Sequence, residues 1–117
     1  MTKKRNLVPQ NGNDVIYTPD NLAYAIIKYF KPQITGKILE PAAGKGAFLR
    51  ALNKNGFKKI YHCEIEEGTD FFNWTNKVDW IITNPPWSLT RKFLQHSYTL
   101  TNNILFLITI NHILGMK

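Results

Sequence analysis

The sequence predicts a single α/β domain built on a largely parallel sheet. Four short apolar segments alternate with segments of helical periodicity, which is the order that strand–helix–strand units produce. The expected strands are apolar on almost every residue, as strands buried on both faces are. The 117 residues, of which 44% are apolar and 20% charged, suffice for one globular domain with one core.

The four expected strands comprise residues 37–40, 58–64, 78–84 and 103–110. We expect the spatial order 58–64, 37–40, 78–84 and 103–110, which leaves the last strand at one edge of the sheet. Residues 66–74 form an expected loop with room for one helical turn. Residues 1–16 are polar and rich in Gly and Asn, so we expect a flexible arm there and a folded domain over residues 17–117.

The first helix is expected within "YTPDNLAYAIIKYF", residues 17–30. Thr18 is the predicted N-cap, and Pro19 suits the first helical position. The apolar side chains recur at helical spacing and predict the stripe that faces the core, which consists of Leu22, Ile26, Ile27 and Phe30.

Two further helices follow the first and third strands. Residues 46–55 form one, and Gly56 ends it in the left-handed conformation. Ser88 is the predicted cap of the other, which extends to Thr99. The side chains expected to point inward from this last helix are Leu89, Phe93 and Leu94.

Composition excludes several classes of protein. No run of 18 apolar residues is present, so we expect no transmembrane helix, and the N-terminus lacks the apolar region of a secretory signal. The single cysteine, Cys63, excludes an internal disulfide and favours a reducing cytoplasm, and we expect no metal site. The net charge of +7 suits a polyanionic partner such as nucleic acid, and equally a Lys- and Asn-rich composition without a binding role, because a basic balance marks a binding surface only where it clusters on one face.

A glycine turn between the first strand and the second helix predicts a ligand site. Gly44 and Gly46 allow a tight turn and close approach of a ligand to the backbone. A phosphate loop is excluded because Leu39 stands where its first glycine is required, and the dinucleotide pattern is excluded by Leu49. Glu40 would repel a pyrophosphate, so a cationic ligand such as an amine or sulfonium fits better.

Glu64 ends the second expected strand, 18 residues beyond Gly46. A carboxylate at that place can accept hydrogen bonds from both ribose hydroxyls of a nucleoside. The alternative is a solvated acid within the acidic segment "EIEE". The spacing and the strand position together favour a nucleoside site.

The segment "NPPW" predicts a second site beside the first. Asn84 follows a strand that opens at the same edge of the sheet as Gly44. Pro85 and Pro86 fix the backbone and keep their carbonyl oxygens as acceptors, and the Asn84 side chain adds another. Two rigid acceptors suit an –NH₂ group, and Trp87 offers a flat face for a planar base.

These motifs resemble the S-adenosylmethionine-dependent amino-methyltransferases. The order of "YTP", "LEPAAGKG" and "NPPW" is similar to that of DNA adenine-N6 methyltransferases of the gamma arrangement. The resemblance implies a Rossmann-like class I methyltransferase sheet, shortened here to about four strands. The family's further C-terminal strands and its target-recognition region have no counterpart in this sequence.

The resemblance also implies roles for individual residues. Thr18 would bind the methionine carboxylate, Glu40 would lie near the cofactor amino group, and Glu64 would hold the ribose. Asp70 would accept from the cofactor's adenine amine, although only six positions separate it from Glu64 where the family has a helix and a strand. The implied cofactor-binding set is Tyr17, Thr18, Pro19, Glu40, Pro41, Ala42, Gly44, Gly46, Glu64, Ile65, Asp70, Phe71 and Asn84. The implied catalytic set is Asn84, Pro85, Pro86 and Trp87.

The function implied by the resemblance is methyl transfer to the exocyclic N6 of adenine in DNA. Three alternatives stay open, namely transfer to RNA, transfer to glutamine in a protein, and a fragment that binds cofactor without transferring anything. DNA is the expected partner. The apolar edge strand at 103–110 further predicts a homodimer, because an exposed strand edge tends to pair with another chain.

Overall fold

The computed structural model of this chain describes residues 17–108, and its centre is a four-stranded sheet. The strands are β1 (Ile38–Glu40), β2 (Ile60–His62), β3 (Trp80–Thr83) and β4 (Ile104–Phe106). They are all parallel and lie in the order β2-β1-β3-β4, which confirms the predicted sheet. The expected arm at 1–16 and the end of the fourth expected strand, 109–110, lie outside the described residues.

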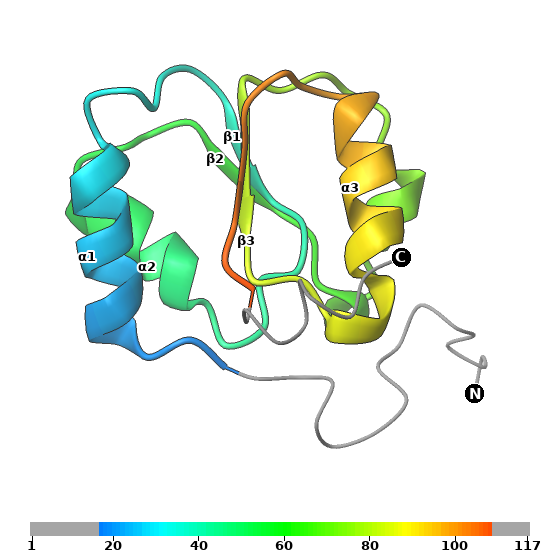
Figure 1. The fold of residues 1–117 in the computed structure, drawn as a ribbon, viewed down its shortest axis with the longest axis horizontal. Coiled ribbons are helices and arrows are strands. Elements are labelled where there is room, and N and C mark those ends of the chain that lie inside the picture. Colours follow the sequence, from blue (N-terminus) through cyan, green and yellow to red (C-terminus); the bar gives the residue numbers. More distant parts are fainter. Residues whose placement is uncertain (1–16, 109–117) are drawn as a thin grey trace.

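The helices cover both faces of this sheet. Figure 1 shows α1 (Asp20–Phe30) and α2 (Ala47–Lys54) on one side and α3 (Thr90–Tyr98) on the other. Three short 3₁₀ turns complete the described elements, η2 (Ile65–Glu67), η3 (Phe71–Asn73) and η4 (Trp87–Leu89). The result is the three-layer α/β arrangement in which ligands bind beyond the carboxyl ends of the strands.

Successive strand residues supply the two halves of the core, because neighbouring side chains of a strand point to opposite faces. Ile38 packs with α1 and α2, whereas Leu39 packs with α3. The first half contains Ala23, Ile27, Ile34, Ile38, Ala47, Phe48, Ala51, Leu52 and Ile82. The second half contains Leu39, Cys63, Phe71, Val78, Ile81, Leu89, Phe93 and Leu100.

The start of α1 differs from the prediction. Pro19, in an extended conformation, occupies the N-cap position, and no side chain caps the helix. Thr18 is therefore not the N-cap, and its hydroxyl contacts another part of the molecule. The helix begins one residue later than expected. Ala23 and Ile27 are its buried residues, and the predicted Ile26 and Phe30 are half-buried against the same core, whereas Leu22 is 43% exposed.

The start of α3 also differs. The turn η4 follows the prolines directly, so the α-helix begins only at Thr90 with Leu89 in the cap position, and Ser88 is not its cap. Leu89 and Phe93 are buried as expected, but Leu94 is only half-buried. Gly56 has a φ of 91°, which confirms the left-handed end predicted after the second helix. None of the helices within residues 17–108 is long and apolar enough to cross a bilayer.

Candidate functional site

A pocket opens at the carboxyl ends of β1, β2 and β3, where both predicted sites meet. Its volume of about 160 Å³ is many times the ~10–15 Å³ that one water requires, so it can admit part of an organic ligand. The predicted residues that line it are Tyr17, Thr18, Glu40, Pro41, Ala42, Gly44, Glu64, Ile65, Asp70, Phe71, Asn84, Pro85 and Pro86. Residues far apart in the sequence thus form one site.

The glycine turn has the conformation that its sequence predicts. Gly44 and Gly46 have φ values of 56° and 85°, in the left-handed region that other residues rarely adopt. A Cβ atom on Gly44 would lie 3.5 Å from the Tyr17 ring, so this ring covers the turn. Lys45 adds a further contact, with its Nζ atom 4.8 Å from the centre of the same ring.

Glu64 was predicted to end the second strand, but β2 ends at His62, and Glu64 instead caps the turn η2 and contacts the glycine turn. Its Oε1 atom accepts a hydrogen bond from the Gly44 N–H at 2.7 Å, and its Oε2 atom accepts from the Glu66 N–H at 3.0 Å. Glu64 is therefore not a freely solvated acid. It holds the turn in place, and its carboxylate lines the pocket at the position where a ribose is expected.

Glu40 is buried at the end of β1, with 2% of its surface exposed. Burial raises the pKa of this carboxyl to about 8, and the nearby Glu64 charge adds to the rise. The Ala42 N–H, which donates to Glu40 Oε1 at 2.8 Å, partly opposes it. Thr83 Oγ1 also favours the ionised form, although this buried oxygen makes no well-formed hydrogen bond within residues 17–108.

The protonation of Glu40 corrects the expectation of a fixed negative charge. A carboxyl with a pKa near 8 is largely neutral at neutral pH, and a cation in the pocket would favour its ionised form. Burial, together with the carboxyls of Glu40 and Asp70, raises the pKa of the neighbouring Cys63 thiol to about 12, so this thiol stays protonated near neutral pH.

A hydrogen bond joins the two motifs that stand at opposite ends of the sequence. Asn84 Nδ2 donates to Thr18 Oγ1 across 3.2 Å. Thr18 therefore lies beside the residue that follows β3, and both line the pocket. The hydroxyl that we expected to cap α1 instead contacts the side chain of Asn84.

The two prolines of the "NPPW" segment are not equivalent. The Pro86 carbonyl accepts from the Leu89 N–H at 3.0 Å and from Thr90 Oγ1 at 3.2 Å. It is thus engaged by the turn η4, which corrects the expectation that both proline carbonyls stay available. Pro85, which is buried and lines the pocket, retains the predicted position for a backbone acceptor.

Asp70 and Phe71 form the wall of the pocket on the side of α3. Asp70 Oδ1 accepts from the Phe72 N–H at 2.9 Å and so begins the turn η3. Phe71 packs against Phe93 and His96, with ring centres 4.9 and 4.7 Å apart. The short segment after Glu64 therefore still brings Asp70 to the pocket.

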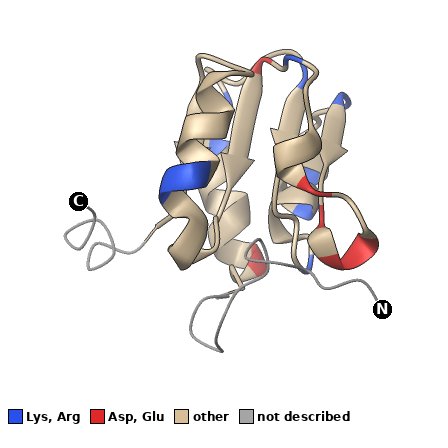
Figure 2. Cartoon of the chain, turned by 90° about the vertical axis from the view of Figure 1, so that its right-hand side faces the viewer, with Lys and Arg blue, Asp and Glu red and all other residues tan. Residues whose placement is uncertain are grey.

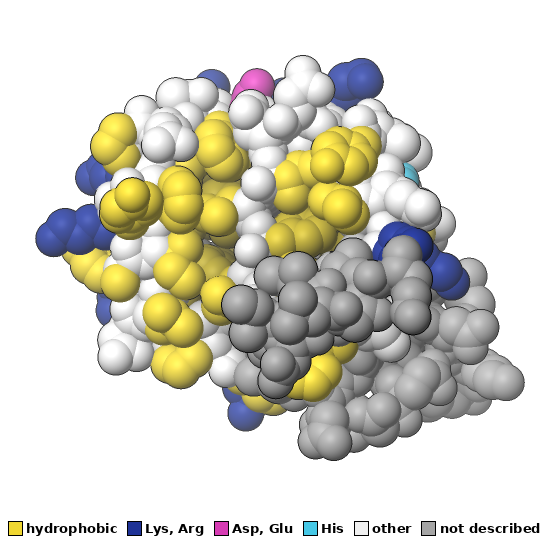
Figure 3. Space-filling view, in the orientation of Figure 1, with side chains coloured by type: hydrophobic (Ala, Val, Ile, Leu, Met, Phe, Trp, Pro, Cys, Tyr) yellow, Lys and Arg dark blue, Asp and Glu magenta, His cyan; other side chains and the backbone are white. Residues whose placement is uncertain are grey.

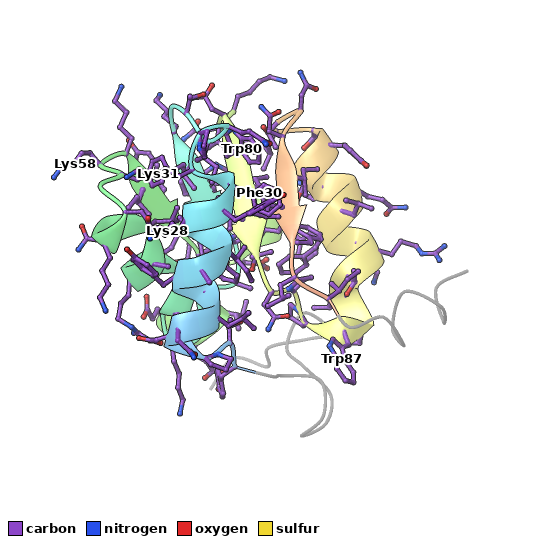
Figure 4. The ribbon with its side chains drawn as sticks, turned by 60° about the vertical axis from the view of Figure 1, so that its left-hand side comes forward. Lys28, Phe30, Lys31, Lys58, Trp80 and Trp87 are labelled. Atoms are coloured by element: carbon purple, nitrogen blue, oxygen red, sulfur yellow. The ribbon has the colours of Figure 1, made fainter. Side chains whose placement is uncertain are left out.

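Three predicted residues do not line this pocket, namely Pro19, Gly46 and Trp87. Gly46 is the N-cap of α2, and a Cβ atom on it would lie 3.2 Å from Arg50 Nη1. Trp87 begins η4, and Figure 4 shows its side chain at the end of the molecule near the start of α3. It lies next to Pro86 in the chain but outside the residues that enclose the pocket.

Sequence analysis missed the residue that ties α1 to α2 beside the pocket. Arg50 forms a two-pronged ion pair with Asp20, with N–O distances of 2.8 and 2.7 Å. Arg50 also donates to the Lys45 carbonyl in the glycine turn. A charged residue on the outer face of the second helix was the only signal in the sequence, and it does not indicate a partner 30 residues away.

Comparison with known proteins supports the fold. No family model and no curated protein matches the chain. A solved structure described as "crystal structure of a putative RNA methyltransferase PH1948 from Pyrococcus horikoshii" superposes with a TM-score of 0.60 at 15% identity. The chain shares the fold of that structure, a Rossmann-like α/β fold. The likeness covers 79% of this chain and 59% of the other, so the chain spans less than two thirds of that structure.

The Rossmann-like fold accounts for where the pocket lies, at the carboxyl ends of the first three strands. Within residues 17–108, no group of three or more His, Cys, Asp or Glu side chains is arranged to hold a metal ion. The polar groups that line the described pocket include carboxyl, amide and hydroxyl groups and the backbone of the glycine turn.

Proposed function

We propose that this protein transfers a methyl group from S-adenosylmethionine to the exocyclic N6 of adenine in DNA. The observation that carries the proposal is the contact between Thr18 and Asn84 at one pocket, which joins the "YTP" motif to the "NPPW" motif. Each motif alone has simpler structural explanations. Their meeting beside a glycine turn is what a nitrogen methyltransferase requires.

The residues of the pocket fit this cofactor. Glu64 and the Gly44 turn suit a ribose, and the buried Glu40 with the adjacent Thr83 hydroxyl suits a cationic amino group. Asp70 and Phe71 suit an adenine ring and its amine. S-adenosylmethionine, when bound, supplies a methyl group on a positively charged sulfur.

The target amine would be held by Asn84 and the Pro85 carbonyl. The lone pair of an exocyclic amine is delocalised into the base, so the nitrogen is a poor nucleophile. Two acceptors that bind its N–H bonds favour a pyramidal nitrogen with a localised lone pair, and such positioning contributes several kcal/mol. No strong base is needed, because the alkylated nitrogen loses its proton readily to water.

Trp87 is proposed to stack on the target base outside the pocket. The base must leave the helical stack to reach Asn84, and an aromatic ring beside the "NPP" turn can stabilise the extruded form. The position of Trp87 at the end of the molecule, near the start of α3, is compatible with a base that approaches from outside.

Transfer to RNA is the second candidate, because the similar solved structure is described as a putative RNA methyltransferase. Labelled cofactor offered with duplex DNA, with RNA and with a protein extract separates the candidates. The proposal expects label in DNA, recovered after hydrolysis as N6-methyladenine. Label in RNA or in glutamine residues would reassign the substrate, and label in none of them would overturn methyl transfer itself.

A further inference from the structure

Charge is distributed unevenly along the length of the molecule. Most of the described acids lie at the pocket end of the sheet, namely Asp20, Glu40, Glu64, Glu66, Glu67 and Asp70. Figure 2 shows basic residues near the other end of the molecule in addition to basic residues beside these acids. The acid at that other end is Asp79, whose carboxylate accepts from the Lys37 N–H at 2.7 Å.

The basic residues include a group that we call the lysine face, Lys28, Lys31 and Lys58. Figure 4 shows these side chains on one side of the molecule, at the end away from Trp87. All three are exposed, and none forms an ion pair within residues 17–108. Tyr24, which is 37% exposed, stands one turn before Lys28 on the same stripe of α1.

Interaction with the helix dipole accounts for two of these three lysines. Lys28 lies in the last turn of α1 and Lys31 is its C-cap, where a positive charge interacts favourably with the helix dipole. Lys58 has no such role, because it stands between Gly56 and β2. Three lysines without acidic partners repel one another, so an anion that lies against all three would be stabilised.

We infer that the lysine face binds the phosphate backbone of a nucleic-acid strand at a place separate from the pocket. The choice of nucleic acid as the polyanion rests on the proposed function. Phosphates attract lysines regardless of base sequence, and the exposed Tyr24 ring offers a surface on which a base can stack.

The position of the lysine face sets a length requirement for its ligand. Asp20 begins α1 next to the pocket, and Lys28 follows eight residues later, which is about 12 Å along the helix at ~1.5 Å per residue. A strand with one phosphate per ~3.4 Å needs roughly four nucleotides to cover that distance. A trinucleotide that occupies the pocket should therefore not reach the lysine face.

The test compares a variant of the lysine face with a matched control. The first carries Lys28→Gln, Lys31→Gln and Lys58→Gln. The control carries Lys77→Gln, Arg91→Gln and Lys92→Gln, which removes the same charge on the α3 side of the sheet. Fluorescence anisotropy without cofactor measures the binding of a labelled 20-nucleotide single strand and of a labelled trinucleotide.

The lysine-face variant should bind the 20-nucleotide strand at least tenfold more weakly than the unchanged protein does. Its affinity for the trinucleotide should be the same as that of the unchanged protein. Its plot of log affinity against log salt should flatten by about 2, since each phosphate contact contributes roughly 0.7 for a single strand. Tyr24→Ala should weaken binding of the long strand severalfold, while Tyr24→Phe should not.

Several results would overturn the inference. One is an equal loss of affinity for the 20-nucleotide strand in the control variant. Another is a loss of affinity in the lysine-face variant that is equal for the 20-nucleotide strand and the trinucleotide, and a third is no loss for the 20-nucleotide strand. Binding to vesicles of anionic lipid with no binding to the strand would reassign the lysine face to a membrane surface. Because these assays measure binding without methyl transfer, they stay informative if the proposed reaction is wrong.

Discussion

The side-chain amide of Asn84 donates a hydrogen bond to the hydroxyl of Thr18, with Nδ2 and Oγ1 3.2 Å apart. The two residues are separated by 66 positions, and the fold brings them to one pocket. A side-chain amide rotates freely unless a partner fixes it. Thr18 thus gives Asn84 a defined orientation, with the carbonyl end of the amide turned away from the hydroxyl.

Replacing Thr18 tests this positioning role. Thr18→Val removes the hydroxyl at nearly constant volume, and a net hydrogen bond is worth ~0.5–1.5 kcal/mol, so we expect kcat to fall roughly two- to tenfold. Thr18→Ser should restore it. Steady-state kinetics and cofactor titration distinguish the two roles of Thr18. A loss confined to cofactor affinity would show that Thr18 binds the methionine carboxylate and does not position Asn84.

Glu64 is expected to be required for cofactor binding. Glu64→Ala removes the acceptor for the Gly44 N–H and the carboxylate proposed to hold the ribose. Hydrogen bonds to a charged group contribute ~1.5–3 kcal/mol, so the dissociation constant should rise at least tenfold by titration calorimetry. Glu66→Ala is the matched control. If the dissociation constant of the cofactor is unchanged in Glu64→Ala, the role left to Glu64 is that of anchoring the glycine turn.

Glu40 should make the stability of the protein depend on pH. Its pKa is about 8 in the fold against 4.5 ordinarily, so between these values the folded state holds a proton that the unfolded state has lost. The free energy of unfolding should therefore fall as pH rises from about 4.5 to about 8. Glu40→Gln stays neutral and should show a flatter profile in urea titrations at several pH values. Parallel profiles for the two proteins would contradict the assigned pKa.

The edge strand β4 carries the prediction of a homodimer. β4 pairs with β3 on one side, and its side chains Ile104, Leu105 and Phe106 are only half-buried. Figure 3 shows apolar side chains gathered on both sides of this edge. We expect edge-to-edge pairing of two copies, with the molar mass of a dimer in light scattering after size exclusion.

Variants of Ile104 test that pairing. The Asn103 carbonyl and the Leu107 N–H form backbone hydrogen bonds with β3. Successive residues of a strand direct their backbone groups alternately to its two sides, so the N–H of Ile104 points away from β3. Ile104→Pro removes this donor and should yield a monomer, whereas Ile104→Ala keeps the donor and should remain dimeric. A monomeric unchanged protein would show that the edge does not mediate self-association.

The sequence predicted the positions of the strands and most of the pocket, because both follow from local patterns. Short apolar segments between stretches of helical periodicity locate β1 to β4. Gly44 and Gly46 mark the turn after β1, which must lie at the carboxyl edge of a parallel sheet. Parallel strands bring all such ends to one edge, so Glu40, Glu64 and Asn84 could be predicted as neighbours without any knowledge of their contacts.

Other features depend on tertiary structure and left no local signal. The proton on Glu40 results from complete burial, which a strand end does not reveal. The Pro86 carbonyl is occupied because η4 follows the prolines at once, where a cap at Ser88 was expected. Thr18 was assigned to the helix next to it in sequence, whereas its partner is Asn84, 66 positions away at the end of β3.

The most direct test of the account is methyl transfer to DNA by the unchanged protein and by Asn84→Ala, with cofactor affinity measured on both. Losing one acceptor for the target amine typically costs ~2.7–4 kcal/mol, so the rate should fall roughly 100- to 1,000-fold while the dissociation constant for S-adenosylmethionine changes little. Equal rates in the two proteins would contradict the central claim that Asn84 holds the reacting amine.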